Sequence, residues 1–299
     1  MTTKTPPLLE PYLGLPAEAS LIVLSGILGA STNWLVLRHL SSCLGSGGGG
    51  ASSFKHDVEL DGSAGSPGVD HGTPPAVLLV SFLRDYGYWK DSAGRLGIDL
   101  TALGRKGRFG FVDGLTGLFT STPSGATNAQ PPGPSPNWPQ LSWDKRTGVN
   151  GIQAAIRASI DSLRATSQKV MLVIDQPDLL LAATGATVSG LHDMILELRE
   201  HVHATIITLS ADEPLVGHQQ QTTLEREHAS LALSLAHEAD ILLALRLLDT
   251  GTANDVSGVV RITRGGGAGG GDGRRPVEEH EYLYHVGGDG GVKVFERGQ

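Results

Sequence analysis

Apolar residues along this chain follow two patterns, which predict two kinds of element. Residues 21–24, 76–82 and 170–175 are almost wholly apolar, which is typical of strands covered on both faces of a parallel sheet. Residues 149–165 and 188–202 repeat apolar side chains at helical spacing and predict amphipathic helices. The same criteria predict helices over residues 31–40, 85–96 and 222–236, and strands over residues 109–112, 204–210, 241–248 and 259–263.

The order of these elements predicts the fold class. Strands and helices alternate over most of the chain, as in an α/β fold with a mainly parallel central sheet. Near the C-terminus, residues 281–286 and 292–295 alternate with a period of two around the glycine-rich residues 287–291, which predicts a hairpin. We therefore expect antiparallel strands to be added at the end of the sheet.

One domain covering residues 1–299 is enough to hold all these elements. Three stretches rich in Gly, Pro or Ser interrupt it, namely residues 44–75, 121–148 and 264–277. Such stretches bury too little apolar area to offset the entropy of ordering, so we expect them to be largely disordered. The second stretch carries Trp138 and Trp143, and aromatic side chains there can pin a loop onto the domain or contact a partner.

Composition and charge limit the classes of function. The formal net charge of −8 argues against a protein coated in basic, nucleic-acid-binding surface, although a local site stays open. The single cysteine, Cys43, excludes an intrachain disulfide and fits a reducing compartment. No apolar run approaches the roughly 20 residues of a membrane span, and the first residues lack a secretory apolar core. We expect a soluble protein of the cytoplasm, with the nucleus as a second location.

The turn at residues 25–30, between the first strand and its helix, lies where α/β proteins place a phosphate-binding loop. That loop requires the pattern G-x-x-x-x-G-K-[ST]. Aligned from Gly26, the chain has Ser31 at the second glycine, Thr32 at the lysine and Asn33 at the magnesium-binding hydroxyl. The sequence therefore predicts the strand, turn and helix of a nucleotide site without the charged groups that bind the phosphates. An ordinary α/β turn is the alternative.

Asp175 ends an apolar strand, where a nucleotide hydrolase keeps the acid that holds magnesium. The alternative is an aspartate that turns the chain at the edge of the sheet. Gln176 follows, so no second acid is adjacent to act as a base. The histidines lack metal-ligand spacing, and the sequence has no G-x-S-x-G, strand-following G-x-G-x-x-G or C-x-x-C motif. We therefore predict no catalytic residue, no cofactor and no metal.

Three segments resemble a known family, that of Elongator complex protein 6. They are residues 81–85 (SFLRD) with Trp89 and Lys90, residues 95–100 (RLGIDL) and residues 111–115 (FVDGL). The resemblance is clearest from about residue 19 to residue 117, and the glycine-rich stretches are similar to those of fungal members. It implies a RecA-like domain, of the P-loop NTPase type, with degenerate nucleotide motifs.

The resemblance also implies partners and a function. Members of this family join Elongator proteins 4 and 5 in a hexameric ring with two copies of each. The ring binds tRNA and attaches to the catalytic Elongator subunits, which modify the wobble uridine of tRNA. Nucleotide hydrolysis is attributed to the ring, so this chain is expected to be a pseudo-ATPase subunit rather than an enzyme.

Loops that follow the central strands of RecA-like rings point into the pore, which suggests residues that meet tRNA. After the strand at residues 204–210, these are His218, Gln219, Gln220 and Gln221, with a solvated loop as the alternative. Arg264, Arg274 and Arg275 flank the glycine-rich stretch near the C-terminus and could also contact RNA, with a solvated tail as the alternative.

The predicted helix after Phe82 carries more aromatic residues than one helix usually buries. Because aromatic and arginine side chains gather at the centres of interfaces, we hypothesise that Arg84 and Trp89 lie at or beside a ring interface. Packing inside the monomer is the alternative. Two other functions remain open, a divergent nucleotide hydrolase or kinase that uses Asp175, and a scaffold that never touches RNA.

Overall fold

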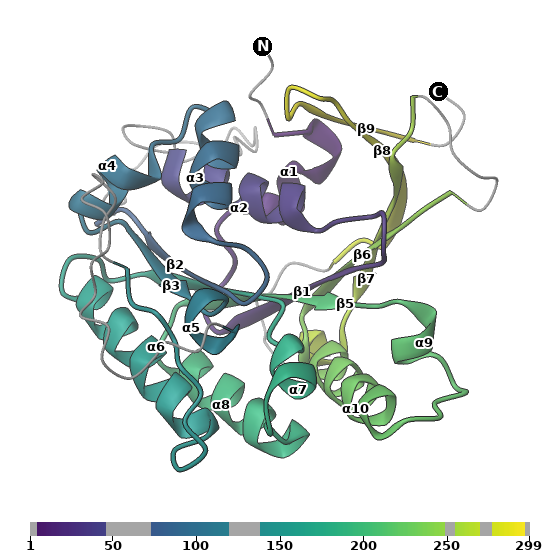
Figure 1. Cartoon of the computed structure of the whole chain (residues 1–299). Helices are drawn as coiled ribbons and strands as arrows, with labels where there is room; N and C mark the ends of the chain where they lie inside the picture. Colours follow the sequence, from purple (N-terminus) through teal and green to yellow (C-terminus); the bar gives the residue numbers. More distant parts are fainter. Residues whose placement is uncertain (1–4, 46–72, 120–137, 249–254, 270–276, 297–299) are drawn as a thin grey trace, which may run out of the picture.

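The computed structural model describes residues 5–45, 73–119, 138–248, 255–269 and 277–296. Within these residues the strands form one nine-stranded sheet in the order β3-β2-β4-β5-β1-β6-β7-β8-β9 (Figure 1). The pairs from β3 through to β6 are parallel, and those from β6 through to β9 are antiparallel. The predicted α/β class, the mainly parallel sheet and the antiparallel C-terminal strands are confirmed.

The strands lie close to the predicted runs. They are β1 (Ser20–Gly26), β2 (Ala76–Ser81), β3 (Phe109–Asp113), β4 (Val170–Asp175), β5 (Ala204–Ser210), β6 (Ile241–Arg246), β7 (Gly258–Arg264), β8 (His280–Val286) and β9 (Val292–Phe295). The α-helices are α1 (Glu10–Leu13), α2 (Asn33–Gly45), α3 (Tyr86–Arg95), α4 (Leu100–Arg105), α5 (Thr116–Phe119), α6 (Val149–Arg164), α7 (Leu179–Ala183), α8 (Val188–Glu200), α9 (Glu213–Val216) and α10 (Thr223–Glu238). Short 3-10 helices cover Pro7–Leu9 and Gly266–Gly269.

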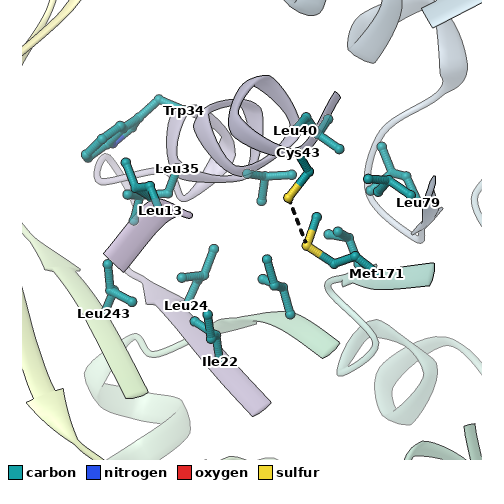
Figure 2. Packing of buried hydrophobic residues seen from close by; sticks show 14 of the residues in the cluster. Leu13, Ile22, Leu24, Trp34, Leu35, Leu40, Cys43, Leu79, Met171 and Leu243 are labelled. Atoms are coloured by element: carbon teal, nitrogen blue, oxygen red, sulfur yellow. Dashed lines mark hydrogen bonds between the residues drawn. The ribbon is translucent and has the colours of Figure 1, made fainter. Parts of the chain in front are cut away.

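Helices cover both faces of the sheet, which explains why the central strands are apolar throughout. In β1, Ile22 and Leu24 face the side covered by α1 to α4, whereas Leu21 and Val23 face the side of α6, α7, α8 and α10 (Figure 1). Successive strand residues point to opposite faces, so each strand needs apolar residues at every position. Figure 2 shows the first layer beneath α2, where the sulfur atoms of Cys43 and Met171 lie 3.7 Å apart.

Local capping fixes the ends of the predicted helices. The Asp85 carboxylate accepts a hydrogen bond from Tyr88 N at 2.8 Å and begins α3, and Gly97 follows that helix with a φ of +77°. Thr222 and Glu225 cap α10 reciprocally. These capping signals lie within a few residues of each other, so the sequence alone predicts them correctly.

Part of the predicted disorder is wrong. Residues 138–148 are ordered, because Trp138 packs against Tyr86 and Phe109 and its neighbours pair with the end of β3. Leu141 N donates to Asp113 O at 2.8 Å in that pairing. The partly buried indole of Trp138 contributes a large apolar area, which the overall composition of the stretch does not reveal. The ends of the other two stretches are also ordered, as parts of α2, β7 and a 3-10 helix, and residues 46–72, 120–137 and 270–276 lie outside the described residues.

The helix after the glycine turn is longer than predicted. It begins at Asn33 and continues to Gly45 instead of ending near residue 40. Leu40, Cys43 and Leu44 are all buried against the sheet, so the apolar stripe continues for another turn (Figure 2). In the same way, α9 forms within residues 211–221, which the sequence predicts as loop throughout.

Candidate functional site

The glycine turn after β1 closes on itself. Ala30 N donates to Ile27 O at 2.8 Å, and Gly29 has a φ of +91°, which favours glycine. A Cβ on Gly26 would lie 2.7 Å from Ala30 O, so the backbone approaches too closely there for a side chain. The turn is therefore tight and filled by its own backbone, and Leu28 stands at its tip with 86% of its surface exposed.

Two backbone amides of this turn, those of Leu28 and Ala30, are hydrogen-bonded within the protein. The carboxylate of Asp212, which follows β5, accepts a hydrogen bond from Leu28 N at 2.8 Å. Ser31 Oγ accepts another from Asn33 N at 3.2 Å. A phosphate-binding loop presents free amides and a lysine to the anion, whereas this turn holds a carboxylate. The turn therefore differs from a phosphate-binding loop in the charge that it holds.

The side chain of Asp175 is buried and hydrogen-bonded within the sheet. Its side chain is 1% exposed and accepts hydrogen bonds from Ser81 Oγ at 2.7 Å and from Thr208 Oγ1 at 2.8 Å. Burial raises the pKa of the carboxyl, and these two hydrogen bonds oppose that increase. Because the partners lie on β2 and β5, Asp175 ties three neighbouring strands together at their carboxyl ends. Each carboxylate oxygen therefore accepts one hydrogen bond from a neighbouring strand.

A second polar cluster lies beside Asp175. Gln176 has a φ of +56°, and its backbone N donates to Thr208 Oγ1 at 2.9 Å. Nearby, the buried His228 Nε2 lies 3.0 Å from Asp178 Oδ2 and joins α10 to the start of α7. These contacts connect the layers on one face of the sheet, and no sequence pattern indicated them. The residues come from three separate segments of the chain.

A cleft of about 400 Å³ opens on the other side of the glycine turn. Its walls come from the turn, from the first turn of α2, from α3 and from the β8–β9 hairpin. Asn33 Nδ2 donates to Tyr88 Oη at 2.7 Å, and the Arg84 guanidinium lies 5.1 Å from the centre of the Tyr88 ring. The sequence pattern singled out Arg84 as a candidate interface residue but did not predict this cleft. The only local signal was the four-residue spacing of Arg84 and Tyr88.

The predicted RNA-contacting residues lie apart from the cleft and from one another. His218, Gln219 and Gln221 are exposed in the loop between α9 and α10. Within that loop, Gln220 Nε2 donates to Gly217 O at 2.8 Å, and Gln221 N donates to the Glu225 carboxylate at 2.6 Å. The loop follows the carboxyl end of β5, and whether it contacts RNA stays a prediction.

Arg264 lies at the opposite edge of the sheet. It pairs in register with Ile241 at the start of β6, whereas the loop of His218 to Gln221 follows the carboxyl end of β5. Arg264 therefore does not form one surface with that loop, because β7 runs antiparallel to its neighbour. Arg274 and Arg275 lie outside the described residues.

The structure separates the two residues of the hypothesised interface. Trp89 is 0% exposed and packs in the core beneath α3, so its side chain offers no surface to a partner, and packing inside the monomer accounts for it. Arg84 is half-buried and lines the cleft. An indole buries a large apolar area, and that area belongs to the domain itself. An interface at Arg84 stays a prediction.

Two further searches cover the described part of the chain only. It contains no group of three or more His, Cys, Asp or Glu side chains that could hold a metal ion. Among the same residues, no helix has both the length and the apolar character needed to cross a bilayer.

The fold and the turn define an α/β protein whose parallel sheet is extended by antiparallel strands and whose glycine turn has no lysine and bonds a carboxylate. The family described as Elongation complex protein 6 matches residues 73–287. The chain is also 23% identical over 279 residues to Elongator complex protein 6 of Xenopus laevis, covering 92% of this chain and 96% of that protein. The chain belongs to the Elongation complex protein 6 family, which confirms the resemblance drawn from its sequence.

Proposed function

We propose that this chain is a non-catalytic, RecA-like subunit of the Elongator complex. In this proposal it assembles with Elongator proteins 4 and 5 into a hetero-hexameric ring with two copies of each. The ring binds tRNA and supports modification of the wobble uridine by the catalytic subunits. The chain contributes structure and RNA contact, and any hydrolysis of ATP belongs to the assembled ring.

One observation carries the non-catalytic part of the proposal. The turn that would hold a triphosphate lacks the lysine, and it binds the Asp212 carboxylate through Leu28 N at 2.8 Å. A phosphate at the same place would meet a negative charge and bonded amides. Asp175 supports the same conclusion, because hydroxyl groups on two neighbouring strands occupy its carboxylate. Membership of the family supports the part that concerns Elongator.

The first test measures nucleotide binding and assembly with the full chain. Calorimetric titration of the isolated chain with ATP and magnesium is expected to give no binding at nucleotide concentrations up to about 1 mM. Co-expression with Elongator proteins 4 and 5, followed by native mass measurement, is expected to give the hexamer. Tight magnesium-dependent binding would favour the hydrolase or kinase reading, and absence of the chain from the assembly would contradict the proposal.

A second test addresses tRNA. Replacing residues His218 to Gln221 by Gly and Ser is expected to weaken tRNA binding by the assembled ring and to leave assembly unchanged. The matched control replaces Lys145, Arg146 and Thr147, which form another exposed loop. Affinity should also fall with salt, because contacts to phosphates release counterions. Equal tRNA affinity of the wild-type and loop-replaced rings at moderate salt would leave the scaffold reading in place.

A further inference from the structure

The tip of the glycine turn forms an apolar projection on the rim of the cleft. Leu28 is 86% exposed there, and Leu247, just after β6, is 42% exposed. A Cβ built on Gly29 would lie 3.4 Å from Leu247 Cδ1, so Leu247 lies beside the tip. Gly29 itself lines the cleft. The two leucines and the cleft therefore belong to one continuous surface.

The turn holds this projection rigidly. Hydrogen bonds fix it on both sides of the exposed leucine, from Leu28 N to Asp212 Oδ1 and from Ala30 N to Ile27 O at 2.8 Å each. An exposed leucine on a mobile loop loses conformational entropy when it binds, whereas a leucine on a fixed turn loses less. A side chain presented in this way is suited to act as an anchor at a protein interface.

The cleft next to the tip is cationic. Arg84 and Arg95 line it, and none of the described residues that line it is acidic. Arg84 Nε is buried without a hydrogen-bond acceptor among the described residues, and Arg95 makes no ion pair there. Arg84 interacts electrostatically with the buried Asp175, whose oxygens accept hydrogen bonds from hydroxyl groups. The described lining of the cleft therefore contains two guanidinium groups and no carboxylate.

The orientation of Arg84 is set before any ligand binds. Its backbone N donates to Ser81 Oγ at 3.0 Å, and its guanidinium stacks over the Tyr88 ring. Tyr88 is in turn fixed by Asn33 on the first turn of α2. The amino end of a helix favours negative charge, so α2 adds to the attraction of the two arginines for an anion.

We propose that this surface docks a segment of a neighbouring protein subunit that presents a carboxylate beside an apolar side chain. The carboxylate binds Arg84 and Arg95, and the apolar side chain covers Leu28 and Leu247. Arginine with aromatic neighbours next to an apolar anchor is the composition found at the centres of interfaces. The inference rests on the proposed function in one respect, namely that the chain is a subunit of a complex.

A protein segment fits this surface better than a nucleotide or RNA does. Leu28 N and Ala30 N of the turn are already bonded, and the described lining of the cleft has two arginines but no lysine, unlike a phosphate-binding loop or a basic groove that follows a nucleic-acid backbone. A phosphate group has no apolar surface with which to cover Leu28, which is 86% exposed. The partner therefore needs both a carboxylate and an apolar side chain, which proteins combine in adjacent residues.

The test compares matched variants of the full chain in titrations with Elongator proteins 4 and 5. Leu28→Asp is expected to weaken assembly by about tenfold or more, as loss of an interface anchor does. Leu28→Ser is the second variant, because an added charge near Asp212 could loosen the turn. The controls are Leu233→Asp and Leu233→Ser on α10. This leucine is 66% exposed, and α10 covers the face of the sheet opposite α2 and α3. Both controls should assemble as the wild type does.

The arginines are tested by charge reversal at two equivalent helix ends. Arg95 lies in the last turn of α3 and Arg164 in the last turn of α6, so both reversals disturb the helix dipole equally. Arg95→Glu is expected to weaken assembly about fivefold and to reduce its dependence on salt, whereas Arg164→Glu leaves both unchanged. Urea denaturation of each variant verifies that the fold is retained.

The outcomes distinguish this inference from the proposed function. If the wild-type chain does not join the assembly, the proposed function fails and the inference fails with it. If the wild type assembles and both Leu28 variants and Arg95→Glu assemble with equal affinity, only the docking surface is refuted. If these variants assemble normally but lose tRNA, the cleft is an RNA site and the inference is wrong.

Discussion

Two regions at the carboxyl edge of the sheet carry polar side chains, and they differ in how their side chains are held. The cleft follows β1 and β2, and Asn33, Tyr88 and Arg84 form one connected set of contacts in it. The loop with His218 to Gln221 follows β5, and among the described residues the hydrogen bonds of its polar groups are local, to Gly217 and to the Glu225 carboxylate.

The difference teaches that polarity alone does not make a site. The loop's hydrogen bonds help to end one short helix and to begin the next, so they serve the local backbone. The cleft brings together residues 55 positions apart and is lined by two arginines. A preorganised set of charges binds with less loss of entropy than a mobile one. The following predictions test this contrast.

The largest expected effect comes from Asp175, which supports both regions. Ser81 Oγ donates to Asp175 and accepts from the backbone N of Arg84 in the cleft. Thr208 Oγ1 also donates to Asp175, and Thr208 lies on β5, which the loop follows. Asp175→Ala leaves two buried hydroxyl groups without their acceptor and is expected to lower the free energy of unfolding by about 4 kcal/mol. Urea denaturation measures it. Asp175→Asn keeps one acceptor and should lose less, and a loss below 1 kcal/mol for the alanine variant would contradict the structural role.

The second effect is a pH dependence centred on α2, whose first turn forms a wall of the cleft. Burial lowers the pKa of His39 from 6.5 to about 4, so the unfolded chain takes up the proton first as the pH falls. The stabilisation is present above pH 6.5 and is lost between pH 6.5 and pH 4. Between pH 7 and pH 4 the wild type should lose about 3 kcal/mol more than His39→Leu does. Equal losses in the two proteins would show that His39 is not responsible.

A smaller effect is expected at the centre of the cleft. Tyr88→Phe removes the hydroxyl that accepts from Asn33 Nδ2 at 2.7 Å and keeps the ring under Arg84. The free energy of unfolding should fall by about 1 kcal/mol, which is the usual net contribution of such a hydrogen bond. Tyr12→Phe is the control. The Tyr12 hydroxyl donates to a backbone carbonyl at an exposed site, so its removal should lower the free energy of unfolding by less.

The smallest effect is expected in the loop. Replacing His218 to Gln221 by Gly and Ser should change the free energy of unfolding by less than about 0.5 kcal/mol, because its side chains are mostly exposed. The measurement is thermal or urea unfolding of the full chain. A loss above 2 kcal/mol would show that the loop is built into the fold as firmly as the cleft is, and the contrast between the two regions would fail.

Much of the fold could be predicted from local sequence. The strands at residues 170–175 and 204–210 lie at their predicted positions, because a strand covered on both faces must be apolar throughout. The caps at Asp85 and Thr222 were predictable because each depends on residues within one turn. For residues 138–148 the sequence indicated that Trp138 can pin the stretch onto the domain, but its contacts with β3 and α3 could not be predicted.

The sequence by itself determined the class of fold, the family and the missing lysine of the glycine turn, because each is written in residue types at fixed local spacing. Only the tertiary structure decided that Asp212 occupies an amide of that turn, that Trp89 is core and that Arg84 lines a cleft. These facts depend on which strands become neighbours. The strand order brings together residues that are distant in the chain, and a local sequence pattern does not specify which strands become neighbours.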